Sequence, residues 1–193
     1  MRFVHAICIV LLLTHAGIEF AHAQETIQAA PQNSSPPVAE GKQRTEEETR
    51  KHLEQLACGP SGVHFLQHTE KGQQVLPEQP VDKGLVYVIR TKAYEGAMVH
   101  AKLAMDAKWV GVNRMANYFY IEVDPGPHYF CLKAGVGPDT IGLLSLVIER
   151  GKTYYLRQNL TLGGNDLDLL DEAEGKKYVA RYHRSVFEVQ PKK

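Results

Sequence analysis

The chain has 193 residues, enough for one domain of ordinary size with appended segments. Lys and Arg together number 22, and Asp and Glu together also number 22, so the formal net charge is zero. A chain without a basic excess gives no indication of nucleic-acid binding, and one without an acidic excess gives none of a charged, solvating tail. No nucleic-acid partner is therefore expected.

The first 23 residues are predicted to form a secretory signal peptide. Arg2 supplies a positive start, residues 6–13 are an apolar run, and Ala21-His22-Ala23 matches the pattern of a cleavage site. The run is too short to span a bilayer, and Cys8 lies too early to be a lipid-acceptor cysteine. We expect an exported protein, periplasmic or secreted, that is cleaved near Ala23 and keeps no transmembrane segment. The alternative is an uncleaved membrane anchor.

Residues 24–43 are polar and rich in Pro, Gln and Ser, which predicts a flexible linker. Residues 44–57 are expected to contain a short helix, because Thr45-Glu46-Glu47-Glu48 has the pattern of a capping box. The Gly and Pro that follow Cys58 should end this helix.

Residues 58–190 are expected to form a mainly β domain. Alternating apolar and polar residues between turn signals predict roughly eight short strands. The expected strands cover residues 63–68, 84–90, 98–105, 108–112, 117–124, 128–132, 143–149 and 152–162. This pattern predicts an antiparallel β-sandwich, with an open barrel as the alternative. Asp171 is expected to cap a helix over 172–183, and residues 186–193 can add a short strand.

The clearest alternation lies in residues 117–124, where Phe119 and Ile121 share one face. Asp124-Pro125-Gly126-Pro127 should form a turn, because proline fixes φ and glycine accepts positive φ. A hairpin with the strand at 128–132 is expected, which would place Phe130 and Leu132 inside as well. A second hairpin is expected between 143–149 and 152–162, and a polar turn is expected at Asn113-Arg114.

The mature chain would keep two cysteines, Cys58 and Cys131. In an oxidising compartment two cysteines have one way to pair within a chain, so a Cys58–Cys131 disulfide is predicted. The alternative is two unpaired buried thiols. The chain has no C-x-x-C motif, which disfavours a redox enzyme.

Several short motifs occur in a familiar order. They are ACGP at 57–60, GLVYVIR at 84–90, NYF at 117–119, DPGPH at 124–128 and GKTYYL at 151–156. In this order the chain resembles a bacterial family of exported domains, catalogued as domain of unknown function number twenty-eight forty-six. The resemblance implies an envelope-associated, prealbumin-like β-sandwich without an assigned activity. Many members look like lipoproteins, whereas this chain lacks the lipid-acceptor site.

No catalytic residue, cofactor site or metal site is expected. The chain has no G-x-S-x-G motif and no Gly-rich phosphate loop that opens a helix. His64 and His68 would lie about 13 Å apart on a strand, too far to share a metal ion. His128 is expected to form a hydrogen bond with the backbone of the neighbouring turn.

One surface is predicted as a candidate binding site. If Phe119 and Ile121 point inward, then Tyr118, Tyr120 and Tyr129 lie on the outer face of one hairpin. Exposed tyrosines could stack on the sugar rings of a cell-wall glycan or anchor an envelope protein. The alternative is that one of the two helices covers them.

The function expected from these features is that of a non-catalytic exported β-sandwich that binds or supports another envelope component. The alternatives are a hydrolytic enzyme without a recognisable motif and a binding protein for a small apolar ligand.

Overall fold

The computed structural model describes residues 45–72, 75–93, 97–135, 141–161 and 164–190. The predicted signal peptide and linker, residues 1–23 and 24–43, lie outside the described residues. The described part is mainly β, with strands in two sheets and two helices. Neither helix is long and apolar enough to cross a membrane.

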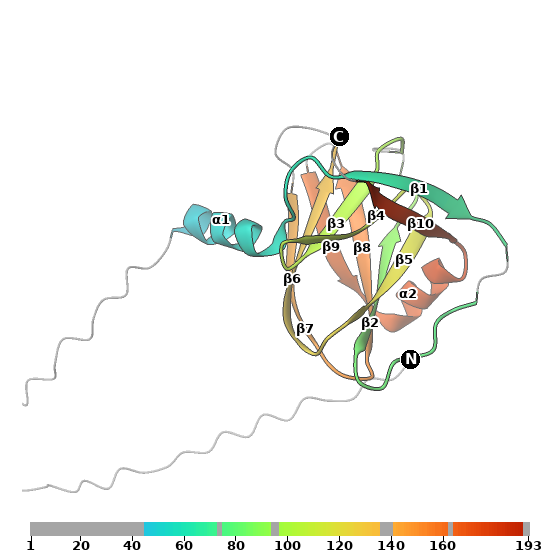
Figure 1. The fold of residues 1–193 in the computed structure, drawn as a ribbon. Coiled ribbons are helices and arrows are strands. Elements are labelled where there is room, and N and C mark those ends of the chain that lie inside the picture. Colours follow the sequence, from blue (N-terminus) through green and yellow to red (C-terminus); the bar gives the residue numbers. More distant parts are fainter. Residues whose placement is uncertain (1–44, 73–74, 94–96, 136–140, 162–163, 191–193) are drawn as a thin grey trace, which may run out of the picture. The chain divides into compact units, whose positions relative to one another are not determined.

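The elements follow one another in a simple order, with one helix before the strands and one near their end (Figure 1). They are α1 (Glu46–Ala57), β1 (His64–Glu70), β2 (Gly84–Arg90), β3 (Ala101–Met105), β4 (Lys108–Asn113), β5 (Asn117–Val123), β6 (Gly126–Ala134), β7 (Ile141–Ile148), β8 (Thr153–Thr161), β9 (Gly164–Leu170), α2 (Glu172–Val179) and β10 (His183–Gln190). The six-stranded sheet has the order β1-β10-β5-β2-β8-β9, and the four-stranded sheet has the order β4-β3-β6-β7.

The main core lies between the inner faces of the two sheets, as a sandwich requires. β2 is the most buried strand, with every residue buried, which agrees with its apolar sequence on both faces. The expectation of a purely antiparallel arrangement is wrong for the larger sheet. In that sheet β2 pairs with β8 in parallel, and β10 pairs with β5 in parallel through two residue pairs.

The hairpin predicted between 117–124 and 128–132 is not present. β5 pairs with β2 and β10, whereas β6 pairs with β3 and β7, so the turn after Val123 carries the chain from one sheet to the other. The predicted inward set is nevertheless correct. Phe119 from β5 meets Phe130 and Leu132 of β6 across the core, from opposite sheets.

The second predicted hairpin is also wrong, for the same reason. β7 pairs with β6 in the smaller sheet, and β8 joins the larger sheet. β8 instead pairs with β9, so residues 164–166, which lie outside the expected strands, begin a strand. The predicted turn at Asn113-Arg114 is shifted, because Asn113 ends β4 as a buried residue.

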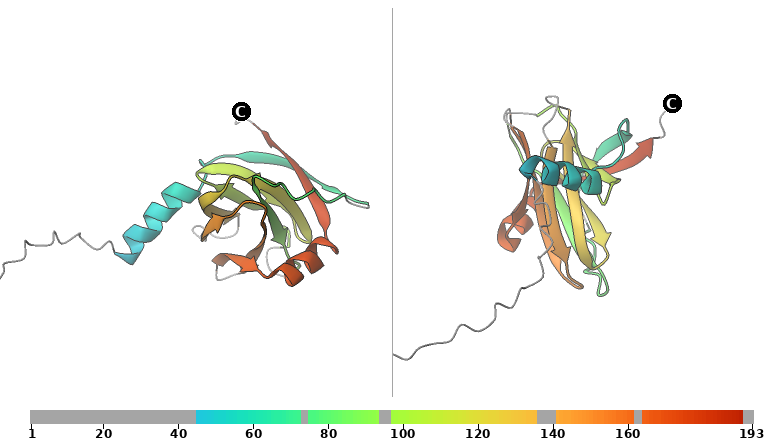
Figure 2. Two further views of the ribbon diagram at one scale, coloured as in Figure 1. Left: turned by 90° about the horizontal axis from the view of Figure 1, so that it is seen from below. Right: turned by 90° about the vertical axis from the view of Figure 1, so that its left-hand side faces the viewer.

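Both helices begin where their capping residues predict. Thr45 and Glu48 form the reciprocal capping box of α1, and Asp171 accepts a hydrogen bond from the Glu174 N–H at the start of α2. α2 ends at Val179, earlier than predicted, because residues 183–190 form β10. Figure 2 shows α1 projecting away from the four-stranded sheet, which it meets at its C-terminal end, and α2 lying beside the six-stranded sheet.

Gly175 brings α2 unusually close to the sheet. Replacing it with alanine is expected to lower the free energy of unfolding by about 1–3 kcal/mol, because a methyl group would overlap the ring of Tyr155. In an exposed helix the same change would be stabilising by about 1 kcal/mol, so the sign of the effect tests the packing. Urea denaturation measures it. Gly135→Ala is the matched control, since a methyl group there meets nothing within 4 Å.

Candidate functional site

The predicted cysteine pair lies at bonding distance. The Cys58 and Cys131 sulfur atoms are 1.98 Å apart, and the two Cα atoms are 5.0 Å apart. Cys58 follows the last residue of α1, and Cys131 points outward from the middle of β6. The pair therefore fixes the end of α1 against the outer face of the four-stranded sheet.

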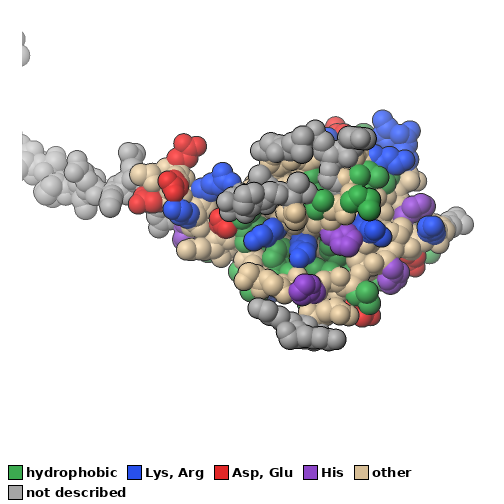
Figure 3. Space-filling view, turned by 90° about the horizontal axis from the view of Figure 1, so that it is seen from above, with side chains coloured by type: hydrophobic (Ala, Val, Ile, Leu, Met, Phe, Trp, Pro, Cys, Tyr) green, Lys and Arg blue, Asp and Glu red, His purple; other side chains and the backbone are tan. Residues whose placement is uncertain are grey.

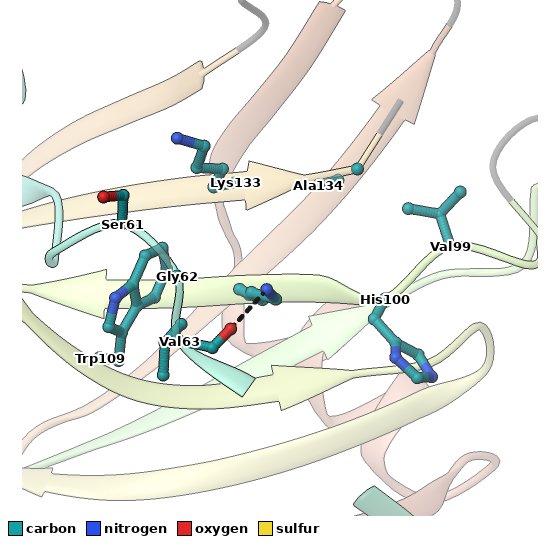
Figure 4. A pocket seen from close by; sticks show the side chains of 10 residues that line it. Ser61, Gly62, Val63, Val99, His100, Trp109, Lys133 and Ala134 are labelled. Carbon is teal, nitrogen blue, oxygen red and sulfur yellow. Dashed lines mark hydrogen bonds between the residues drawn. The ribbon is translucent and has the colours of Figure 1, made fainter. Parts of the chain in front are cut away.

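Residues 58–63, which we call the strap, cross this outer face between α1 and β1. Besides the cysteine pair, two contacts hold the strap. The Trp109 indole Nε1–H donates to the Pro60 carbonyl oxygen at 2.7 Å, and the Lys102 ammonium donates to the Val63 carbonyl oxygen at 3.0 Å. Figure 4 shows the second bond and the strap running beside Trp109. Gly59 packs so tightly on the indole that a Cβ would lie 2.7 Å from its ring atoms.

A cavity of about 260 Å³, which we call the strap cavity, lies along the strap (Figure 4). Its lining combines apolar side chains with basic ones and contains no carboxylate. The lining residues are Ser61, Gly62, Val63, Val99, His100, Lys102, Trp109, Lys133, Ala134 and Gly135. A second cavity of about 450 Å³ shares Trp109 and the end of the strap with the first. The strap thus forms a wall of both cavities.

The charged side chains that line the strap cavity are all basic. Lys102 of β3 and Lys133 of β6 occupy directly opposed register positions, and neither forms an ion pair with a carboxylate in the described part of the chain. Burial lowers the pKa of His100, and the positive charges of Arg114 and Lys102 lower it further. Figure 3 shows Lys, Arg and His side chains gathered around apolar surface on one side of the domain, with acidic side chains mainly at the margins.

The predicted tyrosine surface is not formed. Tyr118 is only 1% exposed, and with Tyr120 it packs in the cluster that α2 joins on the outer face of the six-stranded sheet. Tyr129 lies on β6 in the other sheet, beside the end of α1. The structure therefore separates the three residues, because β5 and β6 belong to different sheets. Of the three, Tyr118 packs with Val179 of α2 and Tyr129 packs with Ala57 of α1.

His128 forms the predicted hydrogen bond with the turn backbone, and its other ring nitrogen has a partner that the sequence did not reveal. Nε2 lies 2.8 Å from the Asp124 carbonyl oxygen, and Nδ1 lies 2.6 Å from Asp106 Oδ2. Asp106 also accepts from the Tyr129 N–H, so this carboxylate joins two neighbouring turns. With both ring nitrogens facing acceptors, the imidazole has no free position for taking a proton from a nucleophile.

Other titratable groups also have structural partners. Arg157 donates to Asp168 Oδ2 through Nε at 3.1 Å and through Nη2 at 3.0 Å, and its Nη1 lies 3.6 Å from Glu174 Oε1. Two closely spaced acidic segments, 166–168 and 171–174, therefore include an ion-paired strand residue, Asp168, and a helix cap, Asp171. Among the described residues, no group of three or more His, Cys, Asp or Glu side chains could hold a metal ion.

A buried polar cluster, also unforeseen, lies within the core. Asn113 Nδ2 donates to the Val88 carbonyl oxygen at 2.9 Å and to Gln158 Oε1 at 3.0 Å. Arg90 Nη1 donates to the Gln158 carbonyl oxygen at 3.4 Å, and burial lowers the pKa of Arg90. These contacts link β2, β4 and β8, so the cluster fixes how the two sheets sit on each other.

The strap cavity was missed at the sequence level, although part of its signal was present. Lys102 and Lys133 each stand between apolar residues in a strand, so both could have been assigned to an outer face. Their direct opposition depends on β3 pairing with β6, two strands that do not follow one another in the chain.

Comparison with known proteins gives one distant relative and no function. The chain is 24% identical over 134 residues to an uncharacterized protein of Haemophilus influenzae, which covers 67% of this chain and 77% of that protein. No family model matches the chain. No solved structure matches it either.

Proposed function

We propose that this protein is an exported, non-catalytic β-sandwich domain that binds or supports another component of the cell envelope. The observation that carries the proposal is the strap cavity, which lies along a segment held at three points. It combines apolar walls with two lysines that have no ion-pair partner among the residues the structure describes. A preformed concave surface with a few polar groups is the usual form of a binding site. Since the strap is fixed at three points, the site would lose little conformational entropy on binding a ligand.

The proposal also includes the location of the protein outside the cytoplasm and a more specific fold, the prealbumin-like sandwich. The N-terminal pattern ending at Ala23 supports export, and a cysteine pair at bonding distance is compatible with an oxidising compartment. The order of sequence motifs supports a prealbumin-like sandwich of the exported family named above. Export predicts that the purified protein begins at Gln24, which intact-mass measurement on protein from the cell envelope would establish. A mass that includes residues 1–23 would contradict it.

The rival proposal, a hydrolytic enzyme, has less support. A histidine and a carboxylate within hydrogen-bond reach would favour it, and His128 and Asp106 are such a pair. The pair lines neither cavity at the strap, however, and the second nitrogen of His128 is engaged by the backbone. Its arrangement suits the joining of two turns better than the activation of a nucleophile.

Site-directed photo-crosslinking tests the binding function. A photoreactive residue at position 61, which lines both cavities, is expected to give a discrete adduct in the envelope of the native host. The matched control is the same residue at position 177, an exposed site on α2. Excess unlabelled protein should suppress the adduct from position 61. Equal labelling from both positions, or none from position 61, would refute the proposal.

A further inference from the structure

Within the described residues, no carboxylate compensates the repulsion between the two lysines of the strap cavity. Directly opposed residues of an antiparallel pair have Cβ atoms about 5 Å apart, and like charges at such positions are destabilising. Elsewhere on the domain, basic side chains such as Arg157, Arg184 and Lys83 lie next to carboxylates. Lys102 and Lys133 have no such neighbour in the described part of the chain, so an anion from outside would relieve the repulsion.

Lys102 keeps the capacity to bind such an anion. Its ammonium group has three N–H donors, and the structure uses one of them for the Val63 carbonyl oxygen. The same bond holds the side chain in place at the cavity wall. His100 also lines the cavity, and burial, together with the neighbouring cations, lowers its pKa and so favours its neutral form.

The rest of the lining selects against a bare inorganic anion. Val63, Val99 and Ala134 give the cavity an apolar wall, and the indole of Trp109 extends it. An apolar wall is best covered by an apolar body. The volume of about 260 Å³ is just below the usual range for drug-sized ligands, so the site suits a small molecule or the end of a longer one.

We infer that the strap cavity binds the anionic head group, carboxylate or phosphate, of a molecule with a short apolar chain, with the charge beside Lys102 and Lys133 and the chain against Val63 and Val99. This inference rests on the proposed binding function and names the chemistry of its ligand. A neutral glycan would leave the two positive charges without a partner.

Intrinsic fluorescence provides a direct test. Trp109 is the only tryptophan in the chain, and it lines the cavity. The mature protein is titrated with octanoate, octyl phosphate, octylamine and octanol below their micellar concentrations. Octanoate, octyl phosphate or both are expected to shift the Trp109 emission saturably, with an affinity that falls as salt is added. Their relative affinities distinguish a carboxylate from a phosphate ligand. Octylamine should not bind.

Charge variants of Lys133 show whether the lysine pair is responsible. Lys133 is exposed and makes no hydrogen bond through its side chain within the described residues, so Lys133→Met should fold normally. It is expected to weaken binding of the anion about fivefold, the upper end of what an exposed ion pair contributes. Lys133→Glu should weaken it at least tenfold, since the new carboxylate repels the ligand. Lys177→Met on α2 should leave it unchanged.

The inference is overturned if octanol or octylamine binds as tightly as the anions, if neither anion binds, or if the Lys133 variants bind like the wild type. If neither anion binds but photo-crosslinking from position 61 still gives an adduct, the inferred ligand class is wrong and the proposed binding function stands. If both fail, both proposals are wrong.

Discussion

Replacing Cys58 and Cys131 together with alanine is expected to lower the free energy of unfolding by about 4 kcal/mol. The two residues are 73 positions apart, and opening a loop of that length releases much of the entropy that the crosslink removes from the unfolded chain. The double substitution also frees the end of α1 and removes one of the three contacts that hold the strap. Guanidinium denaturation of both proteins measures the difference.

Reduction provides the control for this experiment. Wild-type protein unfolded in the presence of a thiol reductant should approach the stability of the double variant, while the variant itself should not respond. Thiol counting on the denatured, unreduced mature protein should find no free thiol. A double variant within about 1 kcal/mol of the wild type would show that the pair contributes little.

Raising the pH from about 10 to about 12 is expected to destabilise the protein strongly through the tyrosine cluster under α2. Burial, together with neighbouring tyrosines, raises the pKa of Tyr87 to about 12, and burial raises that of Tyr118 to about 12 as well. Above the ordinary phenol pKa of 10.0 the unfolded chain releases phenol protons that the folded chain retains, so the free energy of unfolding falls with pH across this window. For Tyr87 the loss across this window is about 2 kcal/mol, and Tyr118 adds to it in the same direction.

Tyr87→Phe isolates this effect. The variant has no phenol to ionise at the centre of the cluster, so its stability should decline less steeply than that of the wild type at alkaline pH. Below about pH 9, where both states keep their phenol protons, the two proteins should respond equally to pH. Parallel curves throughout the alkaline range would show that Tyr87 ionises as readily in the folded chain as in the unfolded one.

The sequence predicted which side chains of a strand face the core more accurately than it predicted which strands pair with each other. The alternation around Phe119 correctly assigned inward and outward residues of β5, because side-chain direction is a local property of the backbone. A turn of a few residues after Val123 is compatible both with a hairpin and with a connection between two sheets, and alternation is the same in either case. The pairing therefore depended on long-range packing, which local patterns do not contain.

The candidate site illustrates the same limit. The cysteine pair was predictable, since only one pairing existed in the mature chain. The strap cavity was not, because it requires the register of β3 against β6 and the position of the chain at residues 58–63. The prediction of a tyrosine surface was wrong because it required Tyr118 and Tyr129 to lie in the same sheet.

The pairing of β1 with β10 sets the order in which this domain can fold. β1 lies at the end of its sheet and pairs along its whole length with β10, from His64 opposite Gln190 to Glu70 opposite Arg184. A nascent chain therefore cannot complete the six-stranded sheet until Gln190 has emerged, and contacts so distant in sequence form slowly. A polypeptide truncated before His183 would leave both edges of β1 open to strands of other molecules, which makes premature termination an aggregation hazard for this protein.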